Sequence, residues 1–232
     1  MVLYTGDIHG DINPIINALY KYKMKQNDII CVLGDVGLNY YLDDRDTQRK
    51  HKLNNKLIQH GTEMLCIHGN HEERPFNINS YITKNWHGGI VYVEETFPNI
   101  LFAKDGEIYD LDGKKSIVIG GAYSVDKFYR LQSGYPWFKD EQPSEKIKLY
   151  VENQLHNVNW KIDQVLSHTC PIKYTPVDRL MKWVDQSTVD KSTEFWLDSI
   201  EDKLEYERWL CGHWHIDRIL GKLRFLMDDY IT

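Results

Sequence analysis

The chain has 232 residues, with 28 lysines and arginines against 34 aspartates and glutamates, which gives a formal net charge of −6. This acidic balance argues against a protein that coats nucleic acid with a basic surface. Hydrophobic residues make up 42% and charged residues 27% of the chain, a composition that excludes an intrinsically disordered protein and favours a globular one.

The sequence also bears on location and domain number. No run approaches the roughly 20 apolar residues that cross a bilayer, and MVLYTGDIHGD becomes acidic before an apolar signal core can form. We therefore expect a cytoplasmic protein that does not enter a membrane. Widely spaced cysteines in or beside apolar runs predict reduced core residues, namely Cys31, Cys66, Cys170 and Cys211. Because no linker or repeat divides the sequence, we expect residues 1–232 to form one domain.

Short apolar runs alternate with longer amphipathic ones in the first third of the chain. Buried strands are predicted at Val2–Thr5, Ile29–Leu33 and Met64–Ile67. The first intervening helix begins near Asp11 or Asn13 and ends near residue 23, and the second covers residues 44–60. This strand-helix alternation predicts a parallel sheet with right-handed crossovers.

The rest of the chain indicates a mixed α/β architecture. Four short apolar runs separated by Asn, Gly and Asp-Gly turns predict antiparallel strands, at Ile90–Val93, Ile100–Ala103, Glu107–Leu111 and Lys115–Ile119. Further on we expect a helix at Ser144–Leu155, a strand at Asp163–Ser167 and a helix at Ser192–Lys203. The chain is expected to close with a hairpin of Glu207–Gly212 and Arg218–Met227.

Polar residues with metal-binding chemistry follow several of the predicted strands. They occur in Gly6-Asp7-Ile8-His9, Gly34-Asp35, Gly69-Asn70-His71-Glu72, Ser167-His168 and Gly212-His213-Trp214-His215. Loops at the carboxyl ends of strands in an open α/β sheet converge on one crevice, so these residues are expected to meet. Imidazole combined with carboxylate suits Zn, Fe or Mn better than Ca or Mg.

The spacing of these residues supports a shared site. Asp7 and His9 are separated by one residue, as are His213 and His215, and in an extended segment such pairs project to the same side. Seven candidate ligands exceed the four positions of a tetrahedral zinc site, which favours two metals that share a carboxylate.

The order D-x-H, G-D, G-N-H-E, H, G-H-x-H resembles the calcineurin-like metallophosphoesterase superfamily from Asp7 to His215, and in particular its small bacterial and phage-type members. The resemblance implies a sandwich of two mixed β-sheets flanked by helices. It also implies two divalent or transition metal ions, Mn, Fe or Zn, of which we expect Mn to support activity. The implied reaction is hydrolysis of a phosphomonoester or small phosphodiester by a water that the metals activate.

The resemblance assigns roles residue by residue. Asp7, His9 and His215 would hold one metal. Asn70, His168 and His213 would hold the other, and Asp35 would bridge the two. His71 would be the acid beside the leaving group. In protein serine/threonine phosphatases the second Asp is followed by Val-Asp-Arg-Gly, whereas here Asp35 is followed by Val36-Gly37-Leu38-Asn39, so the residue that orients His71 is not identified.

Candidate substrate contacts come from cations near these motifs. Arg74, Lys127 and Arg130 are predicted to neutralise substrate phosphate, although each also fits an ordinary surface cation. Gly120–Lys127 follows an apolar strand and is a candidate lining of the cleft. The aromatic cluster that includes Tyr129 and Tyr135 is predicted to pack under a loop rather than stack on a ring.

The expected partner is a phosphorylated small molecule, nucleotide or phosphopeptide. Two alternatives remain at this stage: a nuclease or cyclic-nucleotide phosphodiesterase using the same site, and a metal-binding scaffold without activity. The net charge disfavours extended nucleic acid, and the presence of His71 together with all seven ligands argues against a scaffold. The sequence does not indicate an oligomeric state.

Overall fold

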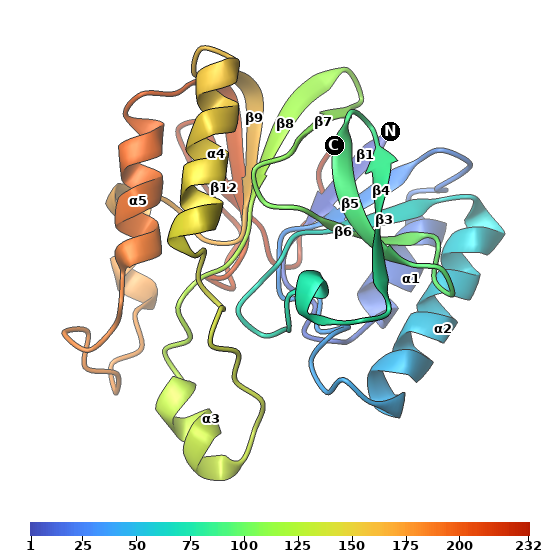
Figure 1. The fold of residues 1–232 in the computed structure, drawn as a ribbon, viewed down its shortest axis with the longest axis horizontal. Coiled ribbons are helices and arrows are strands. Elements are labelled where there is room, and N and C mark those ends of the chain that lie inside the picture. Colours follow the sequence, from blue (N-terminus) through green and yellow to red (C-terminus); the bar gives the residue numbers. More distant parts are fainter.

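Two β-sheets pack face to face in the computed structural model, which describes residues 1–232, and helices cover the outer face of each sheet (Figure 1). None of the helices combines the length and the hydropathy that a membrane span requires. The predicted sandwich of two mixed sheets with flanking helices is therefore confirmed.

The first sheet has the strand order β1-β2-β3-β6-β5-β4, in which β1, β2, β3 and β6 run parallel and the last two strands are antiparallel. Its strands are β1 Val2–Thr5, β2 Ile29–Val32, β3 Glu63–Cys66, β4 Tyr81–Trp86, β5 Gly89–Glu94 and β6 Ile100–Ala103. Helices α1 (Asn13–Lys21) and α2 (Asp44–His60) connect the first three strands, as the alternation in the sequence predicts, and the 3-10 helix η1 (Pro75–Asn77) precedes β4.

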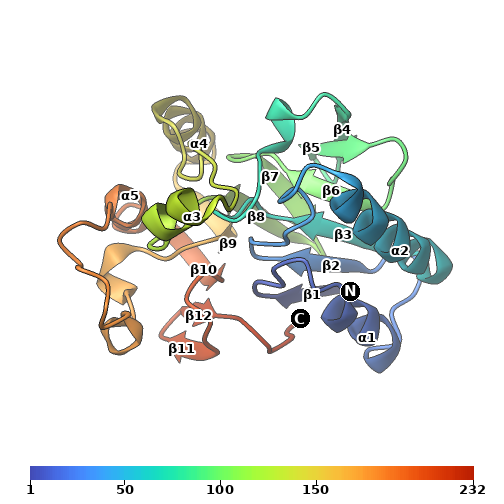
Figure 2. The ribbon, with the colours of Figure 1, turned by 90° about the horizontal axis from the view of Figure 1, so that it is seen from below.

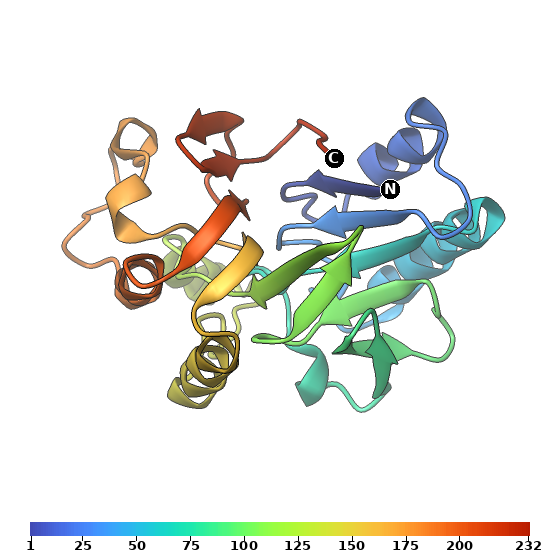
Figure 3. The ribbon, with the colours of Figure 1, turned by 90° about the horizontal axis from the view of Figure 1, so that it is seen from above.

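The second sheet has the order β11-β12-β10-β9-β8-β7, with four parallel strands in the middle and an antiparallel strand at each edge (Figure 3). Its strands are β7 Ile108–Leu111, β8 Lys114–Ile119, β9 Lys161–Ser167, β10 Glu205–Cys211, β11 Arg218–Leu220 and β12 Leu223–Phe225. Its helices are α3 Lys127–Ser133, α4 Glu145–Asn157 and α5 Ser192–Glu201, with the 3-10 helices η2 Ile172–Tyr174 and η3 Val177–Arg179.

Alternating side chains along the strands build three apolar layers. Tyr4 and Leu65 face the second sheet and pack with Leu166 and Leu210 between the two sheets. The neighbouring positions in the first sheet, such as Leu3, face α1 and α2. A third cluster lies between the second sheet and helices α4 and α5. Burial of both faces explains why these strands read as continuous apolar runs. All four cysteines are free and buried, as predicted.

Three features differ from the expectation from sequence. The predicted closing hairpin is wrong, because β10 pairs in parallel with β12, and the real hairpin joins β11 to β12 through Gly221. Strand β4 and helix α3 have no counterpart among the predicted elements. Beyond β12 the chain crosses to the first sheet, where Tyr4 and Ile231 exchange two backbone hydrogen bonds (Figure 3).

Candidate metal centre

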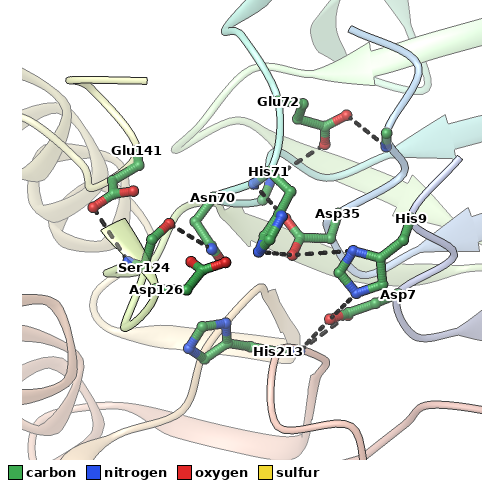
Figure 4. Close-up of polar contacts among 12 residues, drawn as sticks. Asp7, His9, Asp35, Asn70, His71, Glu72, Ser124, Asp126, Glu141 and His213 are labelled. Carbon is green, nitrogen blue, oxygen red and sulfur yellow. Dashed lines mark hydrogen bonds and ion pairs between the residues drawn. The ribbon is translucent and has the colours of Figure 1, made fainter. Parts of the chain in front are cut away.

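The candidate ligands gather at the carboxyl ends of the parallel strands, where the two sheets meet. Asp7, Asp35 and Asn70 follow β1, β2 and β3 of the first sheet, whereas His213 follows β10 of the second (Figure 4). His168 follows β9 of the second sheet. Ligand atoms from these loops form overlapping groups within 4.8 Å: Asp7 with His9 and His215, His9 with Asp35 and His71, and Asp7 with Asp35 and His168.

The first group is formed by Asp7, His9 and His215. The Nε2 atoms of His9 and His215 lie 2.9 Å apart, and Oδ2 of Asp7 lies 3.3 Å from Nε2 of His215 and 3.8 Å from Nε2 of His9. Ligand atoms around one tetrahedral ion, each about 2.1 Å from it, are about 3.4 Å apart. The three donor atoms therefore have the spacing that a single cation requires.

The second group centres on His168 and Asn70. His168 donates its Nδ1 hydrogen to the carbonyl of Leu33 at 2.9 Å, so its Nε2 carries a lone pair. Asn70 donates its amide to Oγ of Ser124, which turns its carbonyl oxygen toward Nε2 of His168 at 2.8 Å. Two acceptor atoms thus face each other, and a cation between them would satisfy both. The ring of His213 lies 4.9 Å from that of His168, centroid to centroid.

Asp35 lies between the two groups. Its Oδ1 is 3.5 Å from Nε2 of His168, and its Oδ2 is 3.9 Å from Nδ1 of His9. Oδ1 also accepts a hydrogen bond from the backbone of His71 at 2.8 Å, which fixes the carboxylate. One carboxylate with an oxygen on each side is the arrangement that a bridging ligand needs.

Left-handed backbone turns aim several of these side chains. His9, Asp35, His213 and His215 all have positive φ, between 46° and 65°. This conformation is unfavourable for residues with a β-carbon and is concentrated at functional sites. The prediction that the Asp-x-His and His-x-His pairs are extended is therefore wrong, and turns rather than strand periodicity bring each pair together.

Two glycines let the sheets approach each other at the centre. A β-carbon on Gly34, which has φ of 100°, would clash with the imidazole of His168. A β-carbon on Gly212 would clash with the carboxylate of Asp7. Because each contact joins one sheet to the other, a larger residue at either position would push the two groups of donors apart.

The pKa values in the centre reflect burial and close charges. Burial alone would raise the pKa of Asp35, but the imidazoles of His168, His71 and His9 outweigh it, so the pKa is lowered. Desolvation, and then the neighbouring His168, lower the pKa of His213 to about 3. A hydrogen bond to Asp7 raises the pKa of His215. The lowered pKa values favour the carboxylate form of Asp35 and the neutral imidazole of His213, the protonation states that metals require.

Glu72 supports the loops that carry the ligands. It is fully buried, and its two oxygens accept hydrogen bonds from the backbone of Gly37 at 3.1 Å and of Gly69 at 3.2 Å (Figure 4). The carboxyl group therefore ties the loop after β2 to the loop after β3. Burial and the nearby charge of Asp35 raise the pKa of Glu72 to about 8.

The residue that contacts His71 is an arginine. Arg130 on α3 donates from Nη2 to Nδ1 of His71 at 2.5 Å, and Nη1 of Arg130 reaches Oγ of Ser124 at 3.3 Å. Asp126 lies 3.5 Å from Nε of the same guanidinium. An acceptor at Nδ1 places the hydrogen of a neutral imidazole on Nε2, which lies 3.9 Å from Oδ2 of Asp35. Burial and the Arg130 charge lower the pKa of His71, although Asp35 opposes them.

The three cations predicted to bind substrate are distributed differently. Arg130 is buried, and its partners are His71, Ser124 and Asp126. Lys127 stacks on the ring of Trp137, with Nζ 4.1 Å from the centroid. Arg74 is buried against Asp105 and lines a different cavity. None of the three lines the cleft over the candidate ligands, so the structure gives no support for direct substrate contact.

That cleft has a volume of about 590 Å³, and candidate ligands, including Asp35 and His213, form part of its lining. Its walls include Tyr129 of α3 and Trp183 from the segment between η3 and α5, whose side chains are 61% and 73% exposed. The prediction that Tyr129 packs under a loop is therefore wrong. Tyr123 and Asp126 line the cleft as well, which agrees with the prediction for Gly120–Lys127.

Comparison with known proteins agrees with this arrangement. A family model described as calcineurin-like phosphoesterase matches residues 1–217. The chain belongs to this family. Members of this family use divalent metal ions to hydrolyse phosphoesters, and the clustered Asp and His side chains of this chain could bind such ions. No curated protein sequence matches this phosphoesterase.

A solved structure shares the fold of the phosphoesterase. The protein TT1561 of Thermus thermophilus aligns with a TM-score of 0.51 and 11% sequence identity, over 97% of this chain and 87% of that chain. At this identity the likeness concerns the architecture alone. The roles of individual residues in the phosphoesterase rest on its own geometry.

Some supporting residues could not be named from sequence. Ser124 accepts a hydrogen bond from the amide of Asn70. It lies in the Gly-Gly-Ala-Tyr-Ser stretch after β8, where the paired glycines after an apolar strand indicate a segment near the cleft. The sequence identifies Arg130 only as a cation. Its contact with His71 depends on the fold of α3, which no sequence pattern revealed.

Proposed function

We propose that this phosphoesterase uses two metal ions to hydrolyse a phosphomonoester or a small phosphodiester, and that residues 1–232 act as one catalytic domain. The observation that carries the proposal is the position of Asp35 between two groups of donor atoms, with His71 beside it. Asp7, His9 and His215 would hold one ion, and Asn70, His168 and His213 the other. We favour Mn for activity because the donor set mixes imidazole, carboxylate and amide oxygen.

The metals would supply positive charge that neutralises the phosphoryl oxygens and makes water acidic enough to attack at neutral pH. The chain's own residues position this chemistry. The buried carboxylate of Asp35 is fixed by the backbone of His71. The amide of Asn70 is fixed by Ser124, whose backbone N–H is in turn held by Glu141 at 3.2 Å. Such fixed supports keep the ligand atoms in place without reorganisation during the reaction.

His71 would assist the leaving group from Nε2. Because Arg130 occupies Nδ1, the hydrogen on Nε2 is the one that His71 can offer to the leaving oxygen. The guanidinium also opposes a second proton on the ring, so His71 offers a hydrogen bond more readily than a full proton. We therefore propose that substrates with stable leaving groups, such as aryl esters, are turned over fastest.

The cleft supports a substrate with a single phosphate and an apolar body. Aromatic and aliphatic side chains such as Tyr129, Trp183 and Met181 form much of its wall, whereas its only lysine and arginine side chains are Arg179 and Lys191. Few cations disfavour polyphosphates and long nucleic acids, whose binding depends on phosphate neutralisation. A phosphorylated small molecule or nucleotide suits the volume and the walls best.

The decisive experiment combines elemental analysis with a substrate panel. The purified protein, loaded with Mn²⁺, is expected to bind close to two ions and to hydrolyse p-nitrophenyl phosphate, bis-p-nitrophenyl phosphate or both. The panel adds a phosphoserine peptide, a mononucleotide, a cyclic nucleotide and single-stranded DNA. A metal-replete protein that leaves every ester intact would refute the enzyme and favour a scaffold.

A further inference from the structure

Helix α5 packs on the outer face of the second sheet, against β9 and β10 (Figure 2). Its first turn carries Glu194, whose side chain is buried. Thr169, which directly follows the candidate ligand His168, donates its hydroxyl to Oε1 of Glu194 at 2.9 Å. The same hydroxyl oxygen accepts a hydrogen bond from Nε1 of Trp214 at 3.2 Å. These two hydrogen bonds connect α5 with the loop after β9 and the loop after β10.

We propose that Thr169 is a positioning residue of the metal centre. Through Trp214 it holds His213 and His215 in the orientation that metal binding requires, and Glu194 in turn fixes the hydroxyl of Thr169. The inference rests on the ligand set of the proposed function. It does not rest on hydrolysis, because it concerns only how the ligands are held.

The donor and acceptor roles in these two hydrogen bonds are fixed by chemistry. An indole nitrogen can only donate, so Oγ1 of Thr169 accepts from Trp214. The single hydroxyl hydrogen is then left for Glu194, whose carboxyl oxygen accepts it. Thr169 has no exposed surface, so solvent cannot replace either partner. Valine at this position has nearly the same shape and removes both hydrogen bonds at once.

Trp214 lies between the two candidate ligands of the loop after β10. Its neighbours His213 and His215 both have positive φ, at 65° and 49°. Such backbone persists only where the surrounding structure holds it in place. The backbone N–H of His213 is held by Oδ1 of Asp7 at 3.0 Å, and the side chain of Trp214 is held by Thr169. Loss of the second support lets the loop relax and moves both imidazoles.

Thr169 is itself fixed well enough to support the loop. Ser167 donates its hydroxyl to the backbone carbonyl of Thr169 at 2.5 Å and accepts from Nε1 of Trp209 at 2.7 Å. All three side chains are fully buried. The backbone of Gly212 also donates to the carbonyl of His168 at 2.9 Å. The candidate ligand His168 therefore lies between two hydroxyl residues, each of which accepts from a tryptophan of β10 or its loop.

The test measures the affinity of the metal-free, full-length protein for Mn²⁺ by calorimetric titration. Thr169→Val is expected to bind Mn²⁺ about 10–100-fold more weakly, the usual effect of removing a support of metal ligands. Thr169→Ser keeps the hydroxyl and is expected to bind like the wild type. Glu194→Gln keeps an acceptor for that hydroxyl and should also bind like the wild type, whereas Glu194→Leu should bind more weakly.

A matched control comes from the neighbouring threonine of α5. Thr193 is as buried as Thr169, and its hydroxyl donates to Oε1 of Gln142 at 2.7 Å, away from the ligand loops. Thr193→Val removes the same group from the interior and is expected to bind Mn²⁺ like the wild type. If Thr193→Val and Thr169→Val lose affinity equally, a general loss of stability is the cause and the proposal is overturned.

A second measurement needs no metal. The indole N–H of Trp214 is expected to exchange slowly with solvent in the wild type and in Thr169→Ser, and faster in Thr169→Val. It is followed by NMR and identified as the signal that Trp214→Phe lacks. Trp214→Phe removes only the donor of the hydrogen bond and should weaken Mn²⁺ binding as Thr169→Val does.

The two measurements separate this inference from the proposed function. A wild-type protein that binds no Mn²⁺ would overturn the ligand set itself. Wild-type affinity in both Thr169→Val and Trp214→Phe, with a wild type that binds Mn²⁺, would overturn the positioning role alone. Equal exchange of the Trp214 N–H in the wild type and Thr169→Val would overturn it as well.

Discussion

The two sheets contribute different chemistry to the metal centre. The loops of the first sheet provide every carboxylate and amide oxygen, from Asp7, Asp35 and Asn70, and Glu72 ties two of these loops together by buried hydrogen bonds. The loops of the second sheet provide only imidazole, and the long segment before α5 adds exposed aromatic wall to the cleft. We therefore expect the negative charge of the centre and the hydrogen bond to the leaving group to depend on the first sheet, and access and substrate shape to depend on the second.

The largest effect on metal content and activity is expected from Asp35, the carboxylate of the first sheet that lies between the two groups of donors. Asp35→Asn removes the charge between both groups of donors, so we expect loss of both metals and a fall in kcat/KM of about 10⁴-fold or more, since several kcal/mol of electrostatic stabilisation are removed. His215→Ala, from the second sheet, should lose one metal and retain the other. Elemental analysis of both variants tests the contrast, which fails if they lose metal equally.

A smaller effect on turnover is expected from His71, the residue of the first sheet proposed to donate a hydrogen bond to the leaving group. His71→Ala should keep both metals and lose about 10²–10³-fold in kcat on alkyl phosphates, because removing one fixed hydrogen-bond donor from a developing negative charge typically costs about that much. The loss should shrink on aryl phosphates, whose leaving groups need little help. Rates measured across a series of leaving groups test this, and a variant with less metal would show that His71 is a ligand instead.

Arg130 lies on α3 and contacts His71, which follows β3 of the first sheet. We expect its replacement to have a moderate effect on turnover. Arg130→Met is expected to lower kcat about tenfold with little change in KM, because Arg130 contacts His71 and does not line the cleft. Its removal should also raise the pKa of His71 and move the acid limb of the pH profile upward. Arg130→Lys should recover part of the rate. A large rise in KM alone would restore the original prediction that Arg130 binds phosphate.

The smallest expected effect is on the free energy of unfolding and comes from the ionisation of Glu72. Because the pKa of Glu72 is raised to about 8, above its usual value of 4.5, the folded metal-free protein holds this proton more tightly than the unfolded chain. Its contribution is therefore present at low pH and lost as the pH rises toward 8, by up to about 1.4 kcal/mol per pH unit. Urea unfolding between pH 6.5 and 8 should show this slope.

A matched variant separates Glu72 from its neighbours. His215 also has a raised pKa and contributes a slope of the same sign, so the informative quantity is the difference between the wild type and Glu72→Gln. The variant cannot ionise at this position and should be less sensitive to pH across the same range. Identical slopes for the two proteins would show that Glu72 is ionised in the folded state.

The elements that place the metal centre were predictable because local patterns determine them. Strands β1, β2 and β3 are apolar on both faces, and each is followed by a glycine and a ligand motif, so Asp7, Asp35 and Asn70 could be placed at one edge of a sheet. Strand β4 was missed because four of its six side chains are exposed and three of those four are polar, which leaves no apolar alternation. Helix α3 was missed because it is short and exposes Phe128 and Tyr129.

The direction of the strands and the contacts between distant side chains were harder to infer from the sequence than the type of each element. Alternation of apolar residues is the same for parallel and antiparallel pairing, so the sequence could not show that β10 runs parallel to β12. The positive φ of His9 and His213 leaves no pattern in the residue order. The pairing of Arg130 with His71 joins positions 59 residues apart, and only the fold brings them together.

The tail that crosses from β12 to Tyr4 has a consequence for handling the protein. β1 is an edge strand, and the two backbone bonds to Ile231 occupy hydrogen-bonding groups that another chain could otherwise pair with. Removing the residues after Met227 would open this edge to strand addition and self-association. A purification tag is therefore safer behind a flexible spacer after Thr232 than as a replacement for these residues.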